Sequence, residues 1–158
     1  MAAISLTFSL SGLTATAKLL CFGDFDSLPA GLATGVRSLK LEHVSPGALV
    51  HQEICRGTPL GQQAQQARRH GSPVPDPTLL AIVRKWFWAR KPDAGFLLSG
   101  FPATLLHARV FDEWLEAREE DLSGCLCADA STAPAVVEHY RALGLPIAEA
   151  AAAVPAPA

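Results

Sequence analysis

GFLLSGFP, residues 95–102, joins a short apolar run to a turn that contains Gly100 and Pro102. An apolar run of this length, bounded by turn residues, is typical of a strand that is buried on both faces. Glycine and proline then end the strand, and apolar residues at helical spacing predict a helix through residues 105–115. A buried strand followed at once by a helix is the repeating unit of an α/β domain.

The same alternation of buried strands and helices extends over most of the chain. Residues 17–22 form another apolar run, closed by Gly23, and strands of this kind indicate a parallel sheet covered on both sides. We therefore predict an α/β fold with a doubly wound parallel β-sheet flanked by helices. Ligands of such sheets bind at the carboxyl ends of the strands, here the loops after Phe22, Val44 and Leu98. Further strands are expected at residues 41–44 and 124–128, with a candidate last strand at 146–148.

Capping residues and the spacing of apolar positions predict the helices between these strands. Ser27 is the predicted N-cap of the first helix, with Pro29 in its first turn, and Asp76 is the predicted N-cap of a later one. Gly57 and Gly144 should each end a helix, because glycine adopts a left-handed backbone conformation without strain. The predicted helices include residues 28–39, 46–56, 62–70 and 133–143.

The composition is that of a globular domain. At 158 residues, the chain is long enough for one domain with a substantial core. Hydrophobic residues make up 49% and charged residues 18%, with a formal net charge of -2 at pH 7. This balance argues against disorder and against a polyanion-binding surface, so we predict no nucleic-acid partner. No apolar run approaches the roughly 20 residues of a membrane-spanning helix, and we predict no membrane association.

The two ends of the chain differ from the rest. Residues 1–16 contain no Lys or Arg to form the charged start of a secretory signal, and we expect them to be a lead-in segment or an edge strand. Residues 149–158 are rich in Ala and Pro, and we expect a frayed tail. The folded domain is accordingly predicted to span residues 17–148.

The four cysteines are Cys21, Cys55, Cys125 and Cys127, and none has the CxxC spacing of a structural zinc site. Each lies in an apolar context, which predicts buried free thiols. Free thiols persist in a reducing compartment, so we expect a cytoplasmic protein.

Three segments together carry a family resemblance: HVSPG at residues 43–47, RGTPLG at 56–61, and GFLLSGFP at 95–102. VPD at residues 74–76 and YRALGL at 140–145 follow the same order and gaps. The pattern resembles the adenylate kinase family of nucleoside monophosphate kinases over roughly residues 17–148. This resemblance implies the fold of the P-loop NTPases.

The family's phosphate-binding loop is degenerate here. Such a loop is rich in glycine and ends in Gly-Lys, because backbone N–H groups must turn toward a phosphate and a lysine must reach its outer oxygens. The corresponding residues read GDFDSLPA, where only Gly23 remains and Pro29 stands at or near the lysine position. Asp24 and Asp26 add negative charge, and each carboxylate about 5 Å from a phosphate charge would cost roughly 3 kcal/mol.

The monophosphate side shows the same losses. Where the family has threonine, glycine and aspartate, and then an arginine that holds the monophosphate, this sequence has Pro46, Gly47, Ala48 and His51. A histidine or alanine cannot replace the charge-assisted contacts that an arginine makes with phosphate. The resemblance therefore implies a weakened monophosphate site.

The third strand and the following turn also depart from the family. Ser99 replaces the aspartate that helps to hold magnesium, Ala103 replaces a phosphate-binding arginine, and His107 lies near the place of the glutamine that reads adenine. After Ala128 the chain enters the closing helix with no lid. Phosphoryl transfer depends on cationic stabilisation, so the resemblance implies a catalytically inactive or very weak enzyme.

We therefore assign no catalytic residue and no metal ligand, and ATP with Mg²⁺ is expected only if residual activity exists. A vestigial site for an adenine nucleotide or nucleoside is one interpretation of the remaining groove, and a purely structural role in turns and packing is the favoured one. The residues of this candidate nucleotide site are Gly23, Gly47, His51, Gly57, Val74, Leu79, Gly100, Phe101, Pro102 and His107.

The residue types also allow two other kinds of site. His51 and His107 could ligate a metal together with Cys125 and Cys127, but core packing is the favoured interpretation of these residues. A nucleophile at Ser99 or at a cysteine is not supported, because no His-acid pair is identifiable at a recognisable spacing.

Trp86, Phe87 and Trp88 form a run of aromatics on one predicted helix. Three consecutive residues of a helix cannot all face one core, so at least one should be partly exposed. An exposed aromatic in an apolar patch would indicate a protein partner or a homo-oligomer. The cations beside this run are expected to form a solvated face or to rim such an interface: Arg84, Lys85, Arg90 and Lys91.

Overall fold

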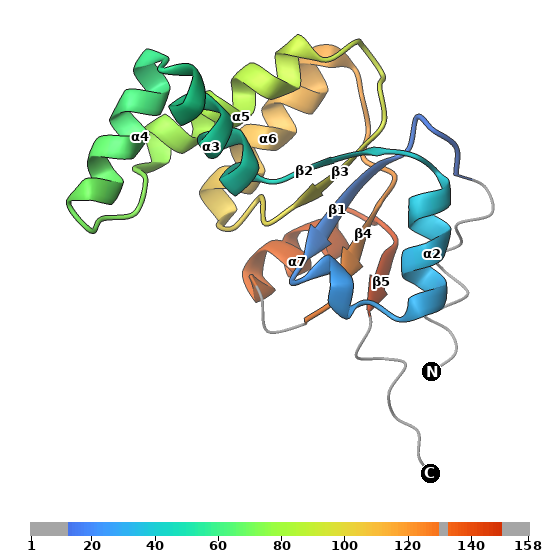
Figure 1. Cartoon of the computed structure of the whole chain (residues 1–158). Coiled ribbons are helices and arrows are strands. Elements are labelled where there is room, and N and C mark those ends of the chain that lie inside the picture. Colours follow the sequence, from blue (N-terminus) through green and yellow to red (C-terminus); the bar gives the residue numbers. More distant parts are fainter. Residues whose placement is uncertain (1–12, 130–132, 150–158) are drawn as a thin grey trace. The chain divides into compact units, whose positions relative to one another are not determined.

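The computed structural model describes residues 13–129 and 133–149 (Figure 1). They belong to two compact units, which we call the sheet unit, Met1–His43 with Asp93–Ala158, and the helical unit, Val44–Pro92. The predicted domain over residues 17–148 includes both. Most of the predicted lead-in segment and of the tail lies outside the described residues.

A five-stranded sheet forms the centre of the sheet unit, in the order β2-β3-β1-β4-β5. The pairs β1–β3, β1–β4 and β4–β5 are parallel, which confirms the predicted α/β class. All five segments predicted as strands are strands, including the candidate last one. Their bounds are β1 Lys18–Phe22, β2 Glu42–Val44, β3 Phe96–Ser99, β4 Gly124–Cys127 and β5 Ile147–Glu149.

Helices cover the two faces of this sheet (Figure 1). On one face, Leu19 and Leu97 form a buried cluster with Val36 of α2. On the other face, Phe96 meets the ring of Phe111 from α6, with ring centres 6.3 Å apart. Alternate residues of a strand point to opposite faces, which accounts for this division. The covering helices are α2 Ala30–Ser38, α6 Leu105–Arg118 and α7 Pro134–Ala142.

The helical unit consists of α3 (Pro46–Arg56), α4 (Pro59–Arg69) and α5 (Asp76–Ala89). Gly57 ends α3 with a φ of 66°, as its sequence position predicted. The hydroxyl of Thr58 accepts a hydrogen bond from the N–H of Gly61 and so caps α4. This cap makes α4 begin three residues earlier than its polar sequence suggested.

Two predicted N-caps are wrong. Ser27 ends a short 3-10 helix, η2 (Phe25–Ser27), and α2 begins at Ala30 with Pro29 as its N-cap. Asp76 is the first residue of α5, and Pro75 occupies the N-cap. In both places a proline with an extended ψ occupies the N-cap, and no side chain there accepts a hydrogen bond from the helix.

Within the described part of the chain, no helix combines the length and the apolar character that a membrane span requires.

Candidate nucleotide site

The carboxyl ends of β1, β3 and β4 lie side by side in the sheet unit. Cys21 is paired with Ser99, and Phe22 with Cys127. The N–H of Gly100 donates to the carbonyl of Cys21 at 3.2 Å, and the N–H of Ala128 donates to that of Phe22 at 2.8 Å. The loops that follow these strands therefore begin at one sheet edge, where parallel α/β sheets bind their ligands.

Gly23 follows β1 at this edge and has a φ of +92°. A Cβ atom on this residue would lie 2.9 Å from the backbone nitrogen of Asp129. The close approach of two backbone segments and the positive φ both require glycine here. The packing of the sheet edge alone thus accounts for this one remaining glycine of the family's loop.

The loop after Gly23 uses its own amide groups internally. The N–H of Asp26 donates to the carboxylate of Asp24 at 3.1 Å, and the N–H of Ser27 donates to the carbonyl of Asp24 at 2.9 Å. The N–H of Leu28 donates to the carbonyl of Phe25 at 3.1 Å. Pro29 has no N–H. Three consecutive donors of the kind that would bind a phosphate are therefore already engaged within the loop.

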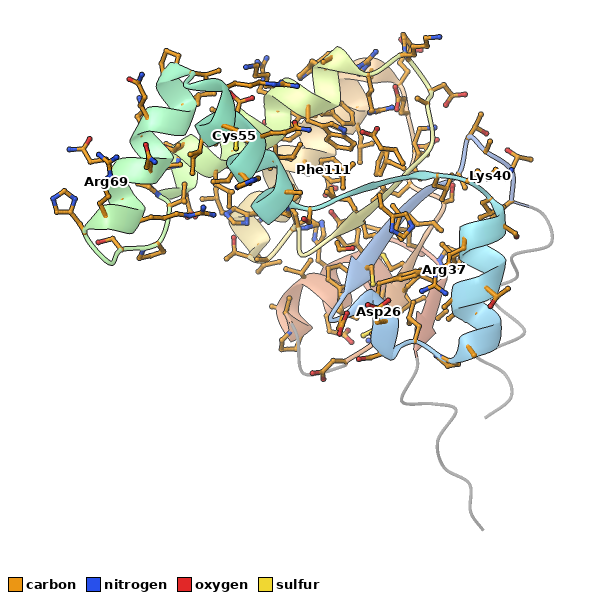
Figure 2. All side chains as sticks on the ribbon, in the orientation of Figure 1. Asp26, Arg37, Lys40, Cys55, Arg69 and Phe111 are labelled. Carbon is orange, nitrogen blue, oxygen red and sulfur yellow. The ribbon has the colours of Figure 1, made fainter. Side chains whose placement is uncertain are left out.

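Side chains hold this loop from outside (Figure 2). Arg37 of α2 lies 3.4 Å from the carboxylate of Asp26, and its guanidinium stands 5.3 Å from the ring centre of Phe25. Phe25 in turn meets the ring of His43 edge-on at 5.1 Å. Arg37 is thus paired with a loop carboxylate.

The loop after β3 carries buried members of the predicted site. Phe101 is fully buried and stacks on His107 at 5.2 Å and on Trp114 at 6.4 Å. His107 is 3% exposed, and its Nδ1 accepts a hydrogen bond from the N–H of Ala103 at 3.4 Å. This bond places the hydrogen of a neutral imidazole on Nε2. Pro102 is also buried, so these three residues are parts of the packed core.

The other half of the predicted site lies in the helical unit. Gly47 and His51 are exposed on α3, Gly57 is the C-cap of that helix, and Val74 and Leu79 are half-buried before and within α5. The capping role of Gly57 explains this glycine without a ligand. A groove that combines these five residues with Gly23, Gly100, Phe101, Pro102 and His107 remains a prediction.

Three of the four thiols are buried, as predicted. Burial raises the pKa of Cys21 and of Cys125 to about 12, which keeps both protonated at neutral pH. The prediction is wrong for Cys55, which is exposed and has its Sγ 3.5 Å from Nε2 of His51. Cys55 lies on the solvent side of an amphipathic helix whose other side carries the apolar residues.

No group of three or more His, Cys, Asp or Glu side chains in residues 13–129 and 133–149 could hold a metal ion. His51 lies in the helical unit, whereas His107 and Cys125 lie in the sheet unit.

The structure contains a His-acid pair that sequence reasoning missed. Nε2 of His139 on α7 lies 2.7 Å from the carboxylate of Asp112 on α6, and the hydroxyl of Tyr140 donates to the same carboxylate at 3.1 Å. Burial and the neighbouring Asp112 raise the pKa of Tyr140, which therefore stays protonated. The three side chains join α6 to α7, and their separation along the chain hid them from spacing arguments.

A buried carboxylate in the helical unit was also missed. Glu53 is 5% exposed and accepts a hydrogen bond from the hydroxyl of Thr58 at 2.5 Å. Lys85 of α5 donates to both of its carboxylate oxygens at 3.1 and 3.2 Å. The hydrogen bond from Thr58 is the largest of the effects that lower the pKa of Glu53, and Lys85 adds to it.

We expect the helical unit to lose stability in acid through Glu53. A carboxyl whose pKa is lower in the folded chain stabilises the fold above its unfolded pKa of 4.5, and this contribution is lost as pH falls through the folded value. Glu53→Gln should therefore be less stable than the wild type at pH 7, and this difference should narrow as the pH falls below 4.5. Urea unfolding at pH 7 and at pH 3 measures the difference, and an equal gap at the two pH values would contradict the prediction.

At least one member of the aromatic run of α5 is partly exposed, as predicted, and Trp86 is half-buried. Trp88 is 38% exposed and Phe87 is fully buried. Three of the four cations beside this run are exposed, as predicted for a solvated face, and Lys85 is one of them although it also binds Glu53. The prediction is wrong for Arg90, which is half-buried with its guanidinium 4.3 Å from the ring centre of Phe87. The long apolar stems of such cations pack on neighbouring surfaces while their charged ends find partners.

The five-stranded sheet, with its parallel pairs and covering helices, defines an α/β protein with a P-loop kinase-like arrangement. Curated adenylate kinases are similar in sequence. The enzyme of Moorella thermoacetica is 37% identical over 101 residues, which cover 61% of this chain and 46% of the relative. The enzyme of Thermosynechococcus vestitus is 36% identical over 105 residues, which cover 66% of this chain and 52% of the relative. An adenylate kinase of Clostridium botulinum is 33% identical over 104 residues, which cover 63% of this chain and 48% of the relative.

These matches confirm the predicted resemblance: the chain is adenylate kinase-like. It spans about half the length of the curated relatives that it matches. No family model matches the sequence.

Proposed function

We propose that this chain is a nucleoside monophosphate kinase relative with no phosphoryl transfer or very weak transfer, a pseudoenzyme on an adenylate kinase scaffold. The observation that supports this proposal best is the loop after β1. Its amides at Asp26, Ser27 and Leu28 bond within the loop, while a phosphate site needs such donors to point outward.

The residues present do not fit ATP with Mg²⁺. Asp24 and Asp26 place two carboxylates in the loop, and Pro29 stands at or near the position of the family's lysine. Ser99, at the end of β3, offers a hydroxyl where the family has a carboxylate, and magnesium prefers charged oxygen ligands. Charge stabilisation supplies most of the rate in phosphoryl transfer, so we derive no catalytic step for this chain.

A second candidate function is the binding of an adenine nucleotide or nucleoside without turnover. The sequence position of His107, near the place that reads the base in the family, favours it, whereas the side chain itself is buried against Phe101. A base or nucleoside requires flat apolar walls and a few hydrogen bonds, whereas a phosphate requires cations. We also propose residues 17–148 as the adenylate kinase-like domain and the cytoplasm as its location.

Calorimetry with adenine nucleotides tests both functions. We expect no measurable heat and no rise in melting temperature with millimolar ATP, ADP or AMP plus Mg²⁺, since a ligand at 100 times its Kd would stabilise the fold by about 2.7 kcal/mol. A coupled assay for ADP should show no formation above background.

The adenylate kinase of Moorella thermoacetica, measured in parallel, is the matched positive control. Micromolar affinity for ATP or robust ADP formation would overturn the pseudoenzyme proposal. A thermal shift with adenosine or AMP alone, without turnover, would instead favour the second candidate.

A further inference from the structure

A groove opens in the sheet unit between α6, the segment after it and α7. Its volume is about 270 Å³, and its walls are formed by Leu115, Leu122 and Leu143, with Tyr140 beside them. Leu143 is 60% exposed and so offers apolar surface to solvent at this groove. The volume lies just below the range of about 300 to 1,000 Å³ that is usual for drug-sized ligands, and suits one large side chain.

Carboxylates surround this apolar groove. Asp112, Glu116 and Asp121 line it, and Glu116 and Asp121 are exposed to solvent. Glu120 also lines it, but is only 7% exposed and lies 3.4 Å from the guanidinium of Arg118. An apolar groove with an acidic rim is complementary to a large apolar side chain that stands next to a cation.

The helical unit presents such a pair of side chains. Arg84 and Trp88 lie four residues apart on α5, and the guanidinium stands 5.8 Å from the ring centre of Trp88. Arg84 is exposed, and Trp88 retains 38% of its surface in solvent. Trp and Arg are the residues most enriched at the energetic centres of protein interfaces.

Charge is divided unequally between the two units. The helical unit, residues 44–92, contains seven Lys and Arg against two Asp and Glu, a formal charge of +5. The sheet unit contains six Lys and Arg against thirteen Asp and Glu, a formal charge of −7. The net charge of the whole chain, -2, does not reveal this division. The groove and the Arg84–Trp88 pair thus belong to parts of opposite charge, and two copies of this chain carry complementary surfaces.

We propose that the chain associates with itself, with Trp88 and Arg84 of one copy docked in the acidic leucine groove of a second copy. Trp88 fills the space beside Leu122 and Leu143, and Arg84 meets Glu116. The two surfaces are different, so the interface is heterologous and leaves a free groove at one end and a free Arg84–Trp88 pair at the other. This proposal is independent of nucleotide binding.

Sedimentation velocity of the full chain at increasing concentration tests the association. We expect dimers and larger species at 50 mM salt that dissociate at 1 M salt, because added ions screen exposed charges. Trp88→Ala and Glu116→Lys should each weaken association about thirtyfold, the effect of losing an interface centre worth about 2 kcal/mol. Arg84→Glu serves as a second variant of the docking pair if Trp88→Ala fails to fold.

Matched controls carry the same charge changes elsewhere. Arg68→Glu changes an exposed cation on α4, and Glu113→Lys changes an exposed carboxylate of α6 that does not line the groove. Both variants should associate as the wild type does. If a control variant weakens association as much as Arg84→Glu or Glu116→Lys does, the effect depends only on net charge. That result would overturn the proposed contact.

Mixing gives the sharpest test. Trp88→Ala retains an intact groove, and Glu116→Lys retains an intact Arg84–Trp88 pair. At a concentration where the wild type associates but an interface about thirtyfold weaker does not, each variant alone should be monomeric, and an equimolar mixture should form one-to-one dimers and nothing larger. A wild type that stays monomeric at every concentration and salt, or a mixture that fails to dimerise, would overturn self-association and leave the groove to a different protein.

Discussion

Phe111→Ala should lower the free energy of unfolding of the sheet unit by about 3 to 5 kcal/mol. The ring of Phe111 is fully buried between α6 and the sheet (Figure 2). It meets the rings of Phe96, Phe101 and Trp114 with centres between 5.8 and 6.3 Å apart. Removal of the ring leaves a cavity among side chains that are fixed by one another, and such a site collapses poorly.

Urea unfolding followed by circular dichroism measures this loss. Glu113→Ala is the control, because Glu113 is exposed two residues away on the same helix and should change stability by less than about 0.5 kcal/mol. Equal stability of Phe111→Ala and the control would show that the aromatic cluster does not hold the sheet unit together.

Gly61→Ala should unfold or severely destabilise the helical unit. We expect its free energy of unfolding to fall by about 3 kcal/mol or more. A Cβ atom on Gly61 would lie 2.1 Å from the carbonyl oxygen of Glu53 and 2.7 Å from the nitrogen of Ile54. These are backbone atoms of α3, so relief requires α3 and α4 to move apart, at a cost at or above the usual range for overpacking. The movement would also disturb the bond between Thr58 and Glu53.

Hydrogen exchange over residues 44–92 locates the effect, because amide protection should fall there first. Gly47→Ala is the matched control in the same unit, since no atom lies within 4 Å of its added Cβ. It should leave stability unchanged or raise it by up to about 1 kcal/mol, the usual gain when alanine replaces glycine in a helix. Wild-type protection in Gly61→Ala would refute the close packing of α3 on α4.

The sequence predicted the architecture well, because the signals that determine it are local. Apolar runs closed by glycine, such as the one before Gly23, marked the strands, and residues 46–56 matched α3 at both ends. The partly exposed aromatic at residues 86–88 followed from helical geometry alone. The two incorrect caps, Ser27 and Asp76, arose where a nearby proline could begin the helix equally well.

The side-chain partnerships could not be predicted in the same way. Two such pairs are Asp112 with Tyr140 and Glu53 with Lys85. Each pair comes into contact only when two helices pack, and the spacing of the residues along the chain does not predict the contact. The internal hydrogen bonds of the loop after Gly23 were equally hidden, because they depend on the short 3-10 helix that replaced the expected helix start. Residue types predicted that this candidate site lacks cations, which stays a prediction, whereas the engagement of its backbone amides depends on how the turn folds.

The turn after β1 determines what an attempt to revive transfer chemistry would require. Replacement of Pro29 by lysine would add a cation, yet the amides of Asp26, Ser27 and Leu28 would stay turned inward. An ancestral activity that was lost through side chains alone returns by reversing them one at a time. In this chain the main chain of the turn bonds to itself, so if transfer is absent as proposed, its recovery would require a new course of the turn as well as new side chains.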